Sequence, residues 1–182
     1  MTYNILLLGA SYGSLLPSKL LFGGHSIHLV CLPEEANLIN AEGFKVRLPV
    51  RGRKDPVLLD SRKLPGKVTA GPAEGVDPKQ YDLVGLCMQE PQYRSPGVRE
   101  LLDAIARSRV PCMSIMNMPP LPYIKRIPGL DYKSLEPAYT DPRVWDSFDP
   151  KTLTLNSPDP QAIRPPGEPA NVLMVKIGRA HV

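Results

Sequence analysis

The stretch ILLLGASYGSLL, Ile5 to Leu16, decides how the N-terminal part of the chain folds. Its unbroken apolar start is typical of a strand that is buried on both faces, as in a parallel sheet. The run then breaks at Gly9 and Gly13, and apolar residues resume at helical spacing. A phosphate-binding loop begins in this way, but the usual G-x-G-x-x-G has serine at Ser11 and Ser14. The stretch is therefore either a cofactor loop with altered spacing or an ordinary strand-to-helix turn.

The residues that follow complete a βαβ unit. Leucines at helical spacing predict a helix that begins near Gly13, places Pro17 in its first turn and stops at Gly23 and Gly24. The apolar run Ser26 to Leu32 predicts a second buried strand. Strand, helix and strand within about 30 residues indicate a parallel pair with a right-handed crossover.

Further elements follow the same α/β pattern. Val98 to Arg109 carries its apolar residues on one helical face, and it lies between two buried runs that predict parallel strands. We therefore predict an α/β fold with a Rossmann-like, doubly wound, mostly parallel sheet. The other expected elements are a short helix at Glu34 to Ala41, a hairpin at Phe44 to Val50 and Val57 to Asp60, strands at Asp82 to Met88 and Pro111 to Met116, and late strands within KTLTL and NVLMV.

Proline divides the chain into two parts. Of 22 prolines, nine precede position 111 and thirteen lie between Pro111 and Pro169. We interpret residues 1–122 as a Rossmann-like dinucleotide-binding domain. Residues 123–175 form a proline-rich C-terminal extension that either completes this domain or leads to a further C-terminal domain.

The last residues, KIGRAHV, fit no element. They can be encoded by a nucleotide sequence that resembles a common sequencing-library adapter, so we interpret residues 176–182 as an artefact and exclude them from the fold. On this interpretation the chain is a truncated N-terminal part of a longer protein. The net charge then falls from +4 to +2, with 20 basic and 18 acidic residues. We expect no nucleic-acid partner, because this charge is small.

The cysteines and histidines indicate no metal site. Cys31, Cys87 and Cys112 lie in apolar runs without metal-ligand spacing, and His25 and His28 lie around the start of the second strand. We expect these side chains to be structural. Without a secretory signal or a membrane-spanning run, the sequence favours a reduced, cytoplasmic location and no membrane partner.

Polar residues follow two later strands. Gln89 and Gln92 come after the Asp82 strand, and Asn117 comes after the Pro111 strand. In open α/β sheets ligands bind beyond the carboxyl ends of the strands, so these side chains could meet a nicotinamide and a substrate. Capping of local turns is the alternative role for each of them.

The segment after the second strand does not indicate whether NAD or NADP is the cofactor. An NAD site usually has Asp or Glu there and an NADP site has Arg nearby. Here the acids Glu34 and Glu35 come slightly late. Arg51, Arg53 and Lys54 could approach a 2′-phosphate, although a solvated basic turn is the favoured interpretation.

Four segments together resemble the N-terminal domain of the ketopantoate reductase family, within the 6-phosphogluconate-dehydrogenase-like oxidoreductases. The resemblance runs from about Thr2 to Pro122. It covers the first helix and second strand, an early hairpin, a strand with its K-x-x-Q loop, and a strand that ends in Asn-Gly. These segments are GSLLPSKLLFGGHSIHLV, EGFKVRLPV, DLVGLCMQEPQ and SIMNMPP.

The resemblance implies specific roles. Asn117 matches the asparagine that contacts nicotinamide and substrate, and it is the predicted catalytic residue. Three positions depart from the pattern: Gln89 stands for the lysine of K-x-x-Q, Met118 for the glycine of Asn-Gly, and Leu32 for an arginine after the second strand. The predicted cofactor-binding residues are Gly9, Ala10, Ser11, Tyr12, Gly13, Met88, Gln89, Gln92 and Asn117.

The implied function is that of an oxidoreductase. We expect hydride transfer between NADP or NAD and a small carbonyl or hydroxy compound, with ketopantoate itself disfavoured because the cationic anchor is missing. The family's catalytic lysine lies in a helical C-terminal domain, so this chain is expected to be an inactive fragment, and the full-length protein a homodimer. The alternative is a Rossmann-like domain that binds a nucleotide or a protein partner without catalysis.

Overall fold

The structure is a computed structural model, and it describes residues 1–10, 15–116, 118–155, 162–163 and 165–175. Four predicted site residues lie outside these ranges: Ser11, Tyr12, Gly13 and Asn117. The segment 176–182 lies outside them as well. No helix within the described ranges has the length and apolar character needed to cross a membrane.

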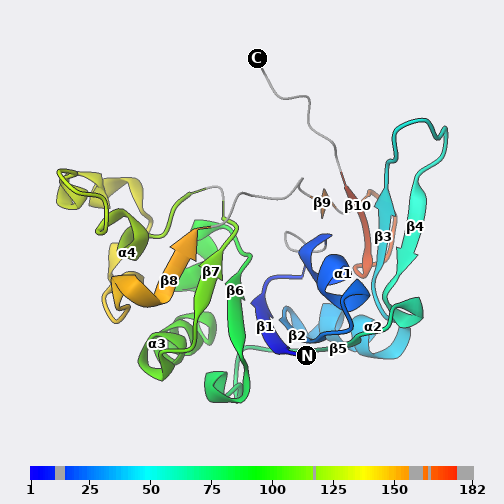
Figure 1. Cartoon of the computed structure of the whole chain (residues 1–182), viewed down its shortest axis with the longest axis horizontal. Helices are drawn as coiled ribbons and strands as arrows, with labels where there is room; N and C mark the ends of the chain where they lie inside the picture. Colours follow the sequence, from blue (N-terminus) through cyan, green and yellow to red (C-terminus); the bar gives the residue numbers. More distant parts are fainter. Residues whose placement is uncertain (11–14, 117, 156–161, 164, 176–182) are drawn as a thin grey trace.

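The larger of two sheets is parallel throughout. Within the described ranges it has six strands in the order β5-β2-β1-β6-β7-β8, so β1 lies inside the sheet with a partner on each side (Figure 1). This confirms the predicted α/β, mostly parallel architecture. The strands are β1 (Asn4–Leu8), β2 (Ser26–Val30), β5 (Lys67–Gly71), β6 (Leu83–Leu86), β7 (Cys112–Ser114) and β8 (Leu153–Leu155).

Alternating side chains of β1 enter two separate cores. Leu6 and Leu8 pack in the core that contains the apolar face of α3 (Val98–Ser108). Ile5 and Leu7 point to the opposite face and pack with α1 (Leu15–Phe22) and α2 (Pro33–Glu42). Since successive side chains of a strand point to opposite faces, one short apolar run covers both sides of the sheet. The sheet is therefore doubly wound, as predicted.

A second, smaller sheet lies beyond α1 and α2, where the β3–β4 hairpin stands at one end of the molecule (Figure 1). Its order is β4-β3-β10-β9, with β3 and β4 antiparallel and β10 parallel to β3. The buried Asn171 holds this junction, since its side-chain amide donates to the carbonyl of Gly43 at 2.7 Å. The strands are β3 (Lys45–Leu48), β4 (Val57–Asp60), β9 (Ala162–Ile163) and β10 (Val172–Val175).

The proline-rich segment consists mostly of short helical turns. It contributes β8 to the larger sheet and both β9 and β10 to the smaller one. The short helices of the chain are α4 (Leu121–Ile124) and the 3-10 turns η1 (Ser61–Lys63), η2 (Pro78–Gln80), η3 (Glu90–Arg94), η4 (Tyr132–Ala138), η5 (Pro142–Trp145) and η6 (Pro150–Thr152).

Strand β5 was not predicted from the sequence. Its residues, KVTAG, form an edge strand parallel to β2, with Ser26 opposite Lys67 and Val30 opposite Gly71. Only one of its residues, Ala70, is buried. A short, polar edge strand has little hydrophobic pattern, so pairing with β2 decides its conformation.

An aromatic cluster joins the proline-rich segment to the main core. Trp145 is fully buried, with its ring centroid 5.4 Å from that of Tyr93 and 5.9 Å from that of Phe148. Tyr139 is also buried, and its hydroxyl donates to the carbonyl of Pro119 at 2.6 Å. These aromatic side chains belong to the main core and are not among the described residues that line the cleft treated below, so they are packing residues.

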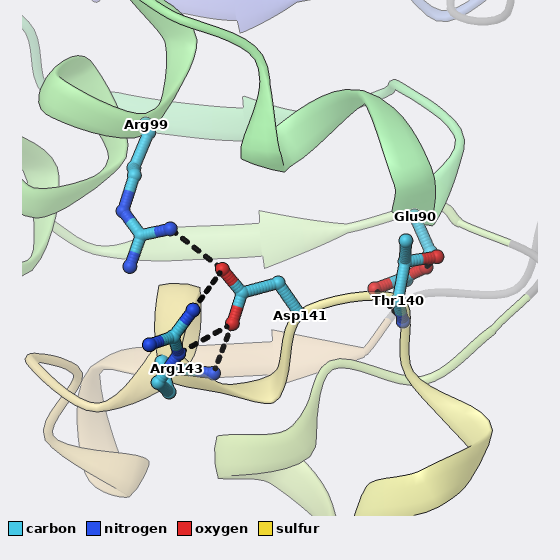
Figure 2. A network of polar contacts seen from close by, with 5 residues as sticks. All are labelled: Glu90, Arg99, Thr140, Asp141 and Arg143. Carbon is cyan, nitrogen blue, oxygen red and sulfur yellow. Dashed lines mark hydrogen bonds and ion pairs between the residues drawn. The ribbon is translucent and has the colours of Figure 1, made fainter.

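Ionic contacts fasten the same segment to α3 and η3 (Figure 2). One oxygen of Asp141 accepts from Arg99 of α3 at 2.6 Å, and the other accepts from the Nε of Arg143 at 3.0 Å. On the neighbouring residue, the Thr140 hydroxyl donates to Glu90 at 2.7 Å. Hydrogen bonds from Arg143 and Arg99 lower the pKa of Asp141 to about 2.

The cluster around Trp145 should carry a large share of the stability. We expect Trp145→Ala to lower the free energy of unfolding by about 3–5 kcal/mol, the usual cost of removing a buried Trp side chain. Trp145→Phe should cost less, because it keeps a ring and removes an indole N–H that has no partner among the described residues. Urea unfolding followed by circular dichroism measures both variants. Equal losses would show that ring packing does not hold this segment.

Asp141 should make stability depend on pH. Its folded pKa lies below its ordinary value of 3.8, so its contribution is complete above about pH 4 and is lost as the pH falls toward 2. Asp141→Asn keeps the oxygen that caps η5 but loses the charge. The difference in unfolding free energy between wild type and this variant should shrink between pH 6 and pH 2.5.

Asp149→Asn is the matched control for that experiment. Asp149 caps η6 through Lys151 N in the same way as Asp141 caps η5, and no ion pair to Asp149 is found among the described residues. Asn and Asp are similar caps, so this variant should change stability little. A difference for Asp141→Asn that stays constant with pH would contradict the ionic role.

Candidate functional site

A cleft of about 590 Å³ opens at the carboxyl ends of four neighbouring strands, β5, β2, β1 and β6. Open α/β sheets bind ligands at this edge. The volume lies within the range of small-molecule sites, about 300–1,000 Å³. The described residues that line it are Gly9, Ala10, Val30, Cys31, Leu32, Pro33, Glu35, Pro72, Ala73, Glu74, Cys87, Met88, Gln89, Gln92, Ser95, Pro96 and Val98.

Gly9 is the point where the chain leaves β1 and enters the floor of the cleft. Its φ of +103° lies in the region that favours glycine, and a Cβ there would lie 2.7 Å from the carbonyl oxygen of Cys87. Its N–H donates to the carbonyl of Val30 at 2.9 Å, so the backbone is fixed to β2 on one side and pressed against the end of β6 on the other. No larger residue fits here without moving one of these strands.

The segment after β2 forms the next wall. Leu32 is 73% exposed and Cys31 is half-buried, while Glu35 in the first turn of α2 is buried. Burial, together with the negative charge of Glu35, raises the pKa of the Cys31 thiol to about 12. Cys31 is therefore a poor nucleophile and a weak acid. None of the three cysteines forms a disulfide.

The loop after β5 forms a third wall of the cleft, and like β5 itself it was not predicted from the sequence. Cys31 N donates to the carbonyl of Gly71 at 3.0 Å, so this loop is held beside the end of β2. The carboxylate of Glu74 lies against Gly97, the residue that precedes α3. Glu74 and Glu35 thus give two sides of the cleft a carboxylate each.

The loop after β6 is locally braced. Met88 N donates to the hydroxyl of the buried Tyr93 at 3.1 Å, and Gln89 N donates to the side-chain oxygen of Gln92 at 2.8 Å. Burial raises the pKa of Tyr93 well above its ordinary value, so this hydroxyl remains protonated. The side chains of Gln89 and Gln92 are exposed at the cleft, and Gln92 serves as a cap whatever else it binds.

The structure brings five of the predicted cofactor-binding residues together around one cleft: Gly9, Ala10, Met88, Gln89 and Gln92. The basic residues of the β3–β4 turn, Arg51 to Lys54, are exposed and do not line it. The histidines do not line it either: His25 accepts a hydrogen bond from Tyr3 N, and His28 is paired with the hydroxyl of Thr69 at 2.8 Å.

The cleft carries no positive side chain among its described lining residues. Its titratable groups are Cys31, Glu35, Glu74 and Cys87, so any fixed charge on this wall is negative. Within the described ranges no group of three or more His, Cys, Asp or Glu side chains could hold a metal ion.

Solved structures with the same architecture are known. A protein of Ralstonia solanacearum assigned as a ketopantoate reductase matches with a TM-score of 0.65 and 15% sequence identity, over 98% of this chain and 51% of that one. The fold is that of the ketopantoate reductases. The 2-dehydropantoate 2-reductase of Methylococcus capsulatus matches with a TM-score of 0.55 and 17% identity, over 95% of this chain and 45% of that one.

An octopine dehydrogenase structure in complex with NADH and agmatine matches with a TM-score of 0.53 and 14% identity, over 94% of this chain and 39% of that one. No protein-family model matches the sequence, and a search of curated proteins finds no match. The chain spans about half the length of the ketopantoate reductase structures. At these identities the comparisons establish the fold, and the ketopantoate reductase fold of this chain agrees with the resemblance inferred from its sequence.

The close approach at Gly9 gives a direct test of the site. Gly24 also has a positive φ, of +79°, but a Cβ there would have no atom within 4 Å. Gly24→Ala should therefore cost only the backbone strain, about 1–2 kcal/mol. Gly9→Ala should cost about 1–3 kcal/mol more, because its Cβ meets the Cys87 carbonyl. Chemical unfolding of both variants measures the difference, and equal losses would contradict the described contact.

Proposed function

We propose that the cleft binds a nicotinamide dinucleotide, NAD or NADP, and that the chain forms the cofactor-binding part of an oxidoreductase. The reaction proposed is hydride transfer between this cofactor and a small carbonyl or hydroxy compound. The observation that carries the proposal is Gly9, a residue confined to glycine by its backbone and by Cys87, on the floor of a cleft at the carboxyl ends of the strands.

The residues present fit such a cofactor. A pyrophosphate needs close access to backbone at the start of a helix, and Gly9 and Ala10 supply a floor without bulky side chains between β1 and α1. Met88 offers an apolar surface for a flat ring at the end of β6. The amides of Gln89 and Gln92 offer neutral donors and acceptors beside it.

The bound nicotinamide would supply or accept the hydride, and the protein would supply binding and orientation. Carbonyl reduction also needs a proton donor near the reacting oxygen. Cys31, with a pKa of about 12, is too weak an acid, and the described lining has no Lys or His. We therefore propose that this chain binds cofactor but does not turn over substrate by itself.

A non-catalytic nucleotide-binding domain is the second candidate. It is favoured by the lack of a Lys, Arg or His side chain among the described lining residues, which leaves no evident proton donor or substrate-anchoring cation there. The two candidates share a binding event and differ in what accompanies this chain. The coding sequence after the Lys176 codon separates them: a following helical domain with an inward-facing Lys supports the enzyme, and an immediate natural stop supports the binding module.

Calorimetric titration with NADH and with NADPH tests the shared binding event. We expect saturable binding of at least one of them, with competition by ADP-ribose, because ADP-ribose shares the pyrophosphate that Gly9 and Ala10 are proposed to contact. Mixing the bound chain with a 2-oxo acid should leave the nicotinamide absorbance unchanged. If neither dinucleotide gives heat at millimolar concentration, the cofactor assignment is wrong.

A further inference from the structure

We infer that the dinucleotide site selects NAD(H) and discriminates against NADP(H). This inference rests on the proposed function and adds to it the choice between the two cofactors. It depends on the walls of the cleft at the ends of β2 and β5, where carboxylates are present and positive side chains are absent from the described lining.

The sheet order locates the part of the cleft that makes this choice. β2 is the direct neighbour of β1, and β5 is the direct neighbour of β2. A dinucleotide whose pyrophosphate lies over Gly9 and Ala10 places its adenosine ribose toward the end of β2. There the described lining consists of Cys31, Leu32, Pro33 and Glu35.

The charge of this wall favours a hydroxyl over a phosphate. A 2′-phosphate brings a charge of about −1.5 to −2 near neutral pH. NADP sites meet this charge with an arginine, whereas NAD sites present an acid that accepts a hydrogen bond from the 2′-hydroxyl. Glu35 is only 7% exposed, and Glu74 approaches from the loop after β5. The exposed carboxylate of Glu74 would repel a phosphate, and no described lining residue offers a positive charge in return.

The positive side chains that the structure describes do not line this wall. Residues 11–14 are Ser, Tyr, Gly and Ser, so the rest of the loop after β1 adds no cation. Arg47 is paired with Glu168 at 2.6 Å, and Arg99 is paired with Asp141 at 2.6 Å. The basic turn from Arg51 to Lys54 is exposed and does not belong to the lining of the cleft.

Separate calorimetric titrations of the whole chain with NADH and NADPH test the inference. Because like charges in one site are strongly unfavourable, we expect NADH to bind at least about tenfold more tightly at physiological salt. Equal affinities, or tighter binding of NADPH, would overturn the inference while leaving the proposed function intact. Absence of binding by both would instead overturn the proposed function.

Leu32 provides a matched pair of variants. Its side chain is 73% exposed, so substitution should not disturb the fold, which thermal unfolding by circular dichroism verifies. Leu32→Arg should tighten NADPH binding by about tenfold or more and shift the preference toward NADPH, since it adds a phosphate partner. Leu32→Met, which adds no charge, should leave the ratio of the two affinities unchanged. An unchanged ratio in a folded Leu32→Arg protein would show that the end of β2 does not face the 2′ position and would overturn the inference.

Discussion

The contact between the Gly9 backbone and the Cys87 carbonyl is the constraint on which the rest of the structure depends. β1 has a parallel partner strand on each side. At its end, the backbone of Cys87 lies so close to Gly9 that no side chain fits there. β1 also contributes side chains to both cores, Leu6 and Leu8 on one face and Ile5 and Leu7 on the other. The same short segment therefore positions the sheet, the helices and the floor of the cleft. The same residue therefore constrains both the fold and the floor of the candidate site.

Elements with a strong local pattern could be predicted from the sequence. β1 is an unbroken apolar run, which predicts a buried strand. The apolar residues of α3 recur at helical spacing, and Leu101, Leu102 and Ile105 are buried on one face of the helix. β5 could not be found in this way, since it has one buried residue and its conformation follows from pairing with β2. The parallel pairing of β10 with β3 joins residues far apart in the sequence, and no local pattern encodes such a partner.

In the candidate site, too, the residues that follow a local sequence pattern could be predicted and the others could not. Gly9, Met88 and Gln92 could be predicted because strand ends and a glycine turn are visible in the sequence, and all three line the cleft. Glu74 was missed because its loop follows the unpredicted β5. The local role of Gln92 as a cap was the alternative interpretation, and the structure supports it with a hydrogen bond from Gln89 N to the side-chain oxygen of Gln92. Contact of Gln92 with a ligand stays a prediction. Burial of Glu35 could not be read from a short helix with two adjacent acids.

The position of Trp145 has an experimental consequence. It is the single tryptophan of the chain, and its ring lies 5.4 Å from that of Tyr93, whose hydroxyl holds the backbone of Met88 at the edge of the cleft. The protein therefore carries one tryptophan fluorophore, shielded from water and connected to the cleft through two residues. Its emission provides an optical signal with a single origin, so that events in the cleft can be followed without attaching a dye.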